Sequence, residues 1–295
     1  MNRRQFSQLI AAAGAAQALP RSQAQAPASS KGFRFSVQLW TIEKQAPFDR
    51  CLEIVAAAGY EGVELIGEFR KWSADETRRI MAKMASLHLH FDMISGVKSG
   101  FADPNGTENF LADLKTQFGY AKALQSPQIN LKSGPRIDSL SPAAQHAASV
   151  ENLKRAADLA AVNNIQLVLE PIDSIENPTM YMSSVSQGFA IVREVASPHV
   201  KVLYDFYHEQ RAAGNLIEKL EQNFDLVGLV HIADVPNRNQ PGTGEIDYSN
   251  IYKKLAQLKY DKFIAMEFFP VGDPLAILKS ARLQALQAQA LVNRE

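Results

Sequence analysis

The chain has 295 residues, of which 46% are hydrophobic and 21% charged, so it can bury a large core and is neither disordered nor fibrous. Its 31 basic residues balance 31 acidic ones, which excludes a strong overall attraction to nucleic acid or to an anionic membrane. The single cysteine, Cys51, cannot form a disulfide within the chain, and its apolar neighbours predict a packed helix face. These properties favour a globular protein that acts on a small molecule.

Residues 1–30 are typical of an export signal followed by a linker. Arg3 and Arg4 precede an apolar stretch from Leu9 to Leu19, as in twin-arginine signals, and Ala24-Gln25-Ala26 has the small residues expected before a cleavage site. The apolar stretch is shorter than the roughly 20 residues that a membrane-spanning helix needs. We therefore expect cleavage near residue 26, export to the periplasm and no membrane contact after cleavage.

Short β-branched or aromatic runs alternate with longer segments of helical period from residue 31 onward, the pattern of parallel strands joined by helices. The predicted strands are Phe33–Trp40, Gly62–Leu65, Leu89–Ile94, Gln128–Leu131, Gln166–Glu170, Val200–Tyr204, Leu226–Ile232 and Phe263–Glu267. The predicted helices include Phe48–Ala58, Ala74–Leu87 and Ala143–Asn163. Even spacing of eight strands, with no glycine-rich phosphate loop after the first, favours a closed (β/α)8 TIM barrel over a doubly wound sheet. We expect residues 31–295 to form this single catalytic domain.

Local signals at the helix ends agree with this division of the chain. Ser73 stands three residues before Glu76, a capping box that begins a helix. Pro142 suits a first helical turn. Gly59 is placed to end a helix just before the second strand.

Four consecutive predicted strands end in a group that can bind or transfer charge: Glu170, Asp205, His231 and Glu267. The carboxyl ends of barrel strands face the same side, where barrel enzymes have their active sites, so we expect the four side chains to converge. Several acids at one barrel mouth repel each other unless a cation offsets their charge. Three carboxylates and an imidazole suit Mn²⁺, Mg²⁺ or Co²⁺, which predicts a divalent-metal site.

The segments around these residues resemble those of hydroxypyruvate isomerases. The resemblance rests on the segments 169–173, Leu-Glu-Pro-Ile-Asp, and 204–208, Tyr-Asp-Phe-Tyr-His, and above all on the run from His231 to Tyr248. The resemblance covers most of the chain after residue 33. It implies membership of the wider xylose-isomerase-like superfamily of sugar isomerases and epimerases.

The resemblance implies roles for individual residues. Glu170 and Glu267 would be the acid/base pair as well as metal ligands, and Asp205 and His231 would complete the metal shell. His208 and Arg238 correspond to side chains that contact the substrate. Glu176 has a spacing from Glu170 also seen in ketose epimerases and is a further candidate for substrate binding.

Two positions depart from the isomerase pattern. The isomerases have glutamine where His231 stands, whereas the sugar epimerases have histidine there. The isomerases also tend to carry a lysine before the proline that follows Glu267, where this chain has Phe269. A positive group that could meet a substrate carboxylate is therefore missing at that position.

These observations predict a metal-dependent isomerase of a small hydroxy-carbonyl compound, similar to hydroxypyruvate or tartronate semialdehyde, acting through an enediolate. A periplasmic keto-sugar epimerase, isomerase or dehydratase on the same metal site is the alternative. A metal-dependent hydrolase is less favoured, because it would need more than the six histidines present. The expected partner is a small carbonyl compound or sugar and not nucleic acid; the oligomeric state stays open, a homo-oligomer included.

Overall fold

Eight parallel strands close into a barrel in the order β1 to β8 in the computed structural model, which describes residues 32–294. The strands are β1 (Arg34–Gln38), β2 (Gly62–Ile66), β3 (His90–Ser95), β4 (Gln128–Leu131), β5 (Gln166–Leu169), β6 (Val200–Asp205), β7 (Val227–Ile232) and β8 (Phe263–Met266). The predicted TIM barrel is confirmed. The predicted export signal lies outside the described residues, and within them no helix has the length and apolarity to cross a membrane.

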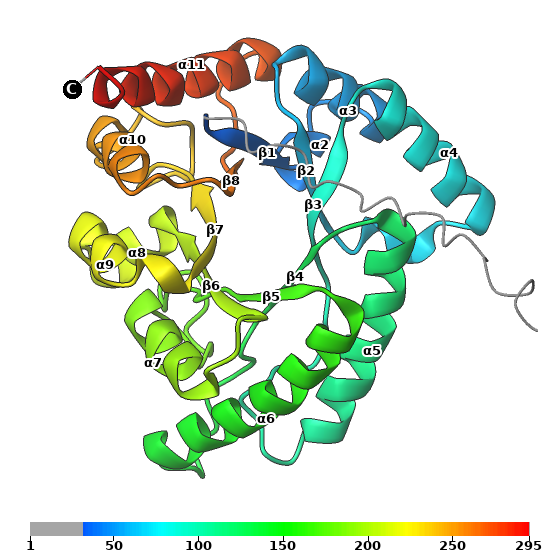
Figure 1. Ribbon diagram of the computed structural model, residues 1–295, viewed down its shortest axis with the longest axis vertical. Helices are drawn as coiled ribbons and strands as arrows, with labels where there is room; N and C mark the ends of the chain where they lie inside the picture. The colour runs from blue at the N-terminus through cyan, green and yellow to red at the C-terminus, as the bar shows by residue number, and fades with distance from the viewer. Residues whose placement is uncertain (1–31, 295) are drawn as a thin grey trace, which may run out of the picture. The chain divides into compact units, whose positions relative to one another are not determined.

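Helices follow one another around the outside of the strands (Figure 1). They are α2 (Trp40–Glu43), α3 (Phe48–Ala57), α4 (Ala74–Ser86), α5 (Thr107–Leu124), α6 (Pro142–Asn163), α7 (Val185–Val195), α8 (Phe206–Ala212), α9 (Leu216–Gln222), α10 (Tyr248–Gln257) and α11 (Pro274–Val292), with the short 3₁₀ helices η1 (Glu68–Lys71) and η2 (Phe224–Leu226). The cap predicted for α4 is present, since Ser73 Oγ accepts a hydrogen bond from the Glu76 N–H at 3.1 Å. Gly59 has φ +84° after α3, as a helix-ending glycine requires.

The first strand is shorter than predicted. Leu39 already has helical dihedrals, φ −65° and ψ −34°, and Trp40 begins α2. The Thr41 hydroxyl donates to the Gln38 carbonyl at 2.8 Å and closes this turn. The chain therefore bends into a helix at the barrel mouth, where the apolar and β-branched residues alone suggested more strand. Cys51 is fully buried on α3, as predicted.

Alternation along the strands gives the barrel an apolar interior beneath a polar mouth. Every second residue of a strand points inward. A cluster of buried apolar side chains, separate from the main core between strands and helices, consists of Met93, Val168, Leu203, Leu229 and Phe263. Two residues beyond Val168, Leu203 and Leu229 on the same side stand Glu170, Asp205 and His231. The predicted site therefore lies directly above a layer of hydrocarbon.

Candidate active site

The four side chains predicted to form the metal site lie together at the carboxyl ends of β5 to β8. One ligand atom from each of Glu170, Asp205, His231 and Glu267 lies within 4.8 Å of the others, and all four residues are buried. Among them, His231 Nδ1 lies 2.7 Å from Glu267 Oε2. Sequence reasoning thus predicted which side chains meet, while their roles as ligands and catalysts stay predictions.

The donor set and its surroundings fit a divalent cation. Asp205 Oδ2 is buried and has no hydrogen-bond partner among the described residues, which is unfavourable unless a cation or ligand group meets it. His231 Nε2 lies 3.0 Å from Glu64 Oε2, an ion pair whose geometry is not that of a hydrogen bond. The other ring nitrogen of His231, Nδ1, therefore points at the cluster. Metal-binding histidines are arranged in this way, with one ring nitrogen facing a carboxylate and the other facing the metal. The residues present would therefore hold the ion by three oxygens and one nitrogen.

Neighbouring charges control the protonation of this cluster. Burial alone would raise the pKa of Glu267, but Arg238 and His231 outweigh it and hold that pKa well below its usual range. Burial is also the largest influence on Glu170 and opposes its ionisation, but Lys132, with smaller contributions from His231 and His208, leaves the pKa of Glu170 lowered. Asp205 has a raised pKa because burial is offset only in part. Both predicted acid/base residues are therefore ionised at neutral pH.

Arg238 supplies the positive charge on one side of the cluster. Its Nη2 lies 2.7 Å from Glu267 Oε2 and 3.5 Å from Asp205 Oδ2, and its Nη1 donates to Glu176 Oε1 at 2.9 Å. The guanidinium is therefore engaged by carboxylates of the chain itself. Its predicted contact with the substrate is untested, and Glu176 enters the site as the partner of Arg238.

His208 presents one ring nitrogen to the site. Its Nδ1 contacts Asp173 Oδ2 at 2.7 Å, and Asp173 Oδ1 accepts the N–H groups of Ile175 and Glu176. His208 Nε2 is buried, lies 3.6 Å from Asp205 Oδ2, and has no hydrogen-bond partner within residues 32–294. Asp173 thus fixes the ring and leaves Nε2 available to a ligand.

Asp173, Glu176 and His208 are also close enough to one another to hold an ion. Protein cations already meet this group, because Arg211 contacts both Asp173 and Glu176. Burial raises the pKa of Asp173, but the hydrogen bond from His208 and the contacts around it leave that pKa lowered. This second group therefore has its negative charge offset without a metal.

Four further residues support the site, and sequence reasoning missed three of them, Asn130, Lys132 and Glu64. Asn130 Nδ2 donates to Glu170 Oε2 at 2.5 Å, and Trp40 Nε1 donates to Glu267 Oε1 at 3.3 Å. Lys132 Nζ lies 3.7 Å from Glu170 Oε2, and Glu64 pairs with His231 as described above. Asn130 and Glu64 are polar residues inside apolar strands, a signal that period-two alternation could have revealed.

The loop after β7 holds Arg238 in place. The Asp234 carboxylate accepts hydrogen bonds from five backbone N–H groups, those of Val235, Gly242, Thr243, Gly244 and Ile246. A Cβ at Gly244 would lie 1.8 Å from the Val235 carbonyl oxygen, so only glycine fits there. Arg238 itself has φ +57°, a conformation that needs such support. The glycine-rich segment therefore wraps around Asp234 and positions Arg238.

A pocket of about 330 Å³ opens over the cluster. Its walls combine apolar and charged residues, namely Trp40, Ile66, Lys132, Glu170, Ile172, Glu176, Asn177, Met180, His208, Arg238 and Glu267. This volume is within the range of small-molecule sites. Apolar and charged side chains in one lining suit a small polar substrate.

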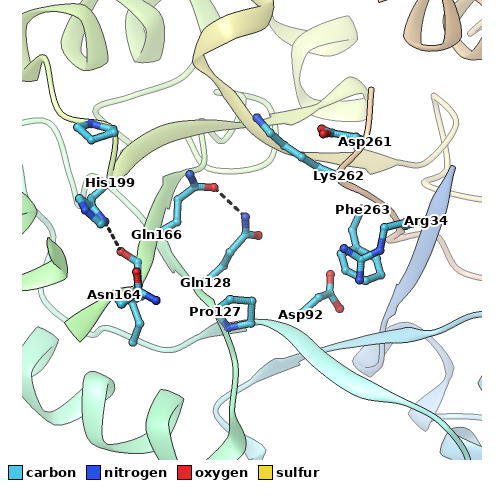
Figure 2. Close-up of a pocket in the computed structure, with 12 residues that line it drawn as sticks. Arg34, Asp92, Pro127, Gln128, Asn164, Gln166, His199, Asp261, Lys262 and Phe263 are labelled. Atoms are coloured by element: carbon cyan, nitrogen blue, oxygen red, sulfur yellow. Dashed lines mark hydrogen bonds between the residues drawn. The ribbon is translucent and has the colours of Figure 1, made fainter. Parts of the chain in front are cut away.

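A larger cavity of about 510 Å³ lies at the opposite, amino-terminal end of the barrel (Figure 2). Some of its polar groups pair with one another: Gln128 Nε2 donates to Gln166 Oε1 at 2.8 Å, and the His199 ring bonds the Ile165 carbonyl. Both carboxylate oxygens of Asp92 have no hydrogen-bond partner among the described residues. This end of a barrel contributes to stability, whereas catalysis takes place at the other end. The smaller pocket is therefore the candidate active site.

Comparison with known proteins shows what this chain is similar to. A family model described as xylose isomerase-like TIM barrel matches residues 52–288. Hydroxypyruvate isomerase from Escherichia coli is 30% identical over 80% of this chain and 93% of its own length, and 2-oxo-tetronate isomerase from Cupriavidus necator is 27% identical over the same shares. The crystal structure of an AP endonuclease of family 2 from Brucella melitensis superimposes with a TM-score of 0.77, at 25% identity, over 84% of this chain and 97% of that one.

Proposed function

The chain belongs to the xylose isomerase-like TIM-barrel family, and from this premise we propose that it is a metal-dependent isomerase of small 2-oxo acids. The curated relatives named above are isomerases of hydroxypyruvate and of 2-oxo-tetronate, which supports both the isomerase class and the kind of substrate. The observation that carries the proposal is the convergence of Glu170, Asp205, His231 and Glu267 beneath one pocket.

Isomerising a 2-oxo acid requires moving a proton between neighbouring carbons through an enediolate. Glu170 is the better base for its removal. Its Oε2 accepts from Asn130, while no described residue donates to Oε1. Glu267 is held by Trp40, His231 and Arg238, so its orientation is fixed and its charge is offset. We therefore assign proton abstraction to Glu170 and proton return to Glu267.

The other residues bind and orient the substrate. A divalent ion held by the four ligands would stabilise negative charge on the two neighbouring oxygens of the substrate. His208 Nε2 faces the same space and would donate to one of these oxygens. The apolar layer under the site and Trp40 beside it limit water around the reacting carbons.

The proposal is tested by proton exchange. Full-length protein supplied with Mn²⁺ is incubated in D₂O with hydroxypyruvate and 2-oxo-tetronate, and ¹H NMR follows product formation and deuterium incorporation. We expect exchange with the wild type and its loss in Glu170→Gln and Glu267→Gln, with circular dichroism unchanged. Undiminished exchange in Glu170→Gln would remove this residue from the mechanism, and no turnover of either acid by the wild type would contradict the function.

A keto-sugar epimerase is the second candidate. The observation in its favour is His231, because sugar epimerases of the superfamily carry histidine where the isomerases have glutamine. Adding keto-hexoses to the same exchange experiment separates the two, since an epimerase would exchange a sugar proton without converting the acids. A hydrolase is less favoured. In the second group of possible ligands, formed by residues 173, 176 and 208, Glu176 is already paired with Arg211 and Arg238.

We also propose that the enzyme is exported. The support is the arginine pair, apolar stretch and cleavage pattern within residues 1–30. Cell fractionation with Arg3→Lys combined with Arg4→Lys tests it. We expect periplasmic protein from the wild type and retention of the variant in the cytoplasm.

A further inference from the structure

Lys132 is a second positively charged side chain in the pocket, besides Arg238. It follows β4 directly, two residues after Asn130 and four after Gln128, so alternation places it on the inward side of that strand. It lines the 330 Å³ pocket together with Glu170, Glu267 and Arg238. β4 and β8 lie on opposite sides of the eight-stranded barrel. Lys132, after β4, and Glu267, after β8, therefore lie on opposite sides of the space for a ligand.

The ammonium of Lys132 has donors to spare. Its Nζ is 3.7 Å from Glu170 Oε2, beyond hydrogen-bond distance, and no hydrogen bond joins it to any residue in the range 32–294. Its side chain is 43% exposed, so the group reaches the open part of the pocket. Arg238 differs, because its three nitrogens already contact Glu176, Glu267 and the Glu267 carbonyl.

Orientation of Glu170 does not depend on Lys132. Asn130 Nδ2 already holds Glu170 Oε2 at 2.5 Å, and the carboxylate is buried in the strand-end cluster. Phe269, two residues after Glu267, is apolar and packs edge-on against Trp40 at 5.0 Å between ring centroids, so it supplies no positive charge there. Of the lysine and arginine that line the pocket, Lys132 is therefore the one that makes no hydrogen bond to residues 32–294.

We propose that Lys132 binds the carboxylate of the substrate, so that this site selects 2-oxo acids over ketoses of the same carbon skeleton. The inference rests on the proposed isomerase function and names the group that would decide its specificity. A lysine at this position supplies a compact point charge with three donors, which suits a single carboxylate oxygen in a partly open pocket.

Matched substrates test the selection. Dihydroxyacetone is hydroxypyruvate with CH₂OH in place of the carboxylate, and erythrulose bears the same relation to 2-oxo-tetronate. Exchange in D₂O gives kcat and KM for each compound with the wild type, Lys132→Gln and Lys132→Arg. We expect Lys132→Gln to lower the acid-over-ketose ratio of kcat/KM by about 10- to 100-fold, mainly through KM, as loss of a charge-assisted hydrogen bond predicts. Lys132→Arg should recover most of that ratio.

Lys44→Gln is the control for a general change in charge near the mouth. Lys44 is exposed and lies over the Phe269 ring at 5.6 Å from its centroid, outside the pocket lining. Its substitution should leave the ratio within twofold of the wild type. An equal loss on acids and ketoses in Lys132→Gln would overturn the inference, because Lys132 would then act only through Glu170.

Failure of the proposed function gives a different result. If the wild type turns over none of the four compounds, calorimetric titration with glycerate still measures carboxylate binding. The inference then predicts glycerate binding that weakens at least 10-fold in Lys132→Gln. Equal glycerate affinity in both proteins, or no binding to the wild type, would contradict it.

Discussion

Replacing Glu64 by glutamine should weaken metal binding although Glu64 is not itself expected to be a ligand. Glu64 is fully buried in β2, and its Oε2 lies 3.0 Å from His231 Nε2. Burial lowers the pKa of His231, but Glu64 and Glu267 outweigh it and raise that pKa well above the usual range. Without an ion the ring is therefore charged, and its Nδ1 is hydrogen-bonded to Glu267. An ion at Nδ1 would displace that proton, while Glu64 would keep the other proton on Nε2.

The size of the effect follows from this geometry. A glutamine amide has the same shape but no charge, and its NH₂ group can face Nε2, which would move the ring proton to Nδ1. Loss of such a partner typically lowers metal affinity 10- to 100-fold, or about 1.4 to 2.8 kcal/mol. We expect the Mn²⁺ dissociation constant of Glu64→Gln to rise by this factor.

Isothermal titration calorimetry of metal-free protein with Mn²⁺ measures the change. Glu209→Gln is the matched control, since Glu209 is another buried acid whose carboxylate contacts Lys219 and the Val185 N–H group. Its dissociation constant should stay within threefold of the wild type. A Glu64→Gln value within twofold of the wild type, in a protein that retains its circular dichroism spectrum, would refute the role of Glu64.

Three further predictions concern the support of the site. Asp173→Asn should reduce kcat/KM for hydroxypyruvate about 10-fold, because His208 loses the carboxylate that fixes its ring; steady-state kinetics with unchanged values would contradict this. Burial and the neighbouring Glu64 raise the pKa of Asp92 in the folded protein. The contribution of Asp92 to the unfolding free energy is therefore complete below the usual aspartate pKa near about 4, and it falls by about 1.4 kcal/mol per pH unit as the pH rises above that value. Asp92→Asn should therefore gain stability relative to wild type as pH rises from 4 to 8 in urea melts, and parallel pH profiles would exclude this. Asp234→Asn should cost at least about 3 kcal/mol of unfolding free energy, since five N–H groups lose a charged acceptor; a loss below 1 kcal/mol would be inconsistent with its role in the loop.

The sequence allowed the barrel and the four converging side chains to be predicted because both follow from local patterns. Parallel strands of a barrel end on the same side, so a polar residue that terminates an apolar run already has a known position. Glu170, Asp205, His231 and Glu267 all stand at such ends. The strand boundaries agree with the structure to within one residue, except that β1 ends at Gln38 and a helical turn replaces the strand expected up to Trp40.

Most of the supporting residues could not be predicted in the same way. Glu64 stands in the middle of β2 and marks no strand end. Lys132 directly follows β4, as Glu170 follows β5, so a strand-end search that included cations could have found it. Which side chains meet across strands depends on register, and register shifts at Val63/Glu64 and at Val202/Leu203. Pairs such as Glu64 with His231 arise only after the barrel has closed. The role of Asp234 is likewise a property of the folded loop.

Anomalous diffraction from crystals grown with Mn²⁺ tests the central claim most directly. The account predicts one strong anomalous peak, about 2.0 to 2.4 Å from oxygens of Glu170, Asp205 and Glu267 and from His231 Nδ1. A peak among Asp173, Glu176 and His208 instead, or none at saturating Mn²⁺, would contradict it.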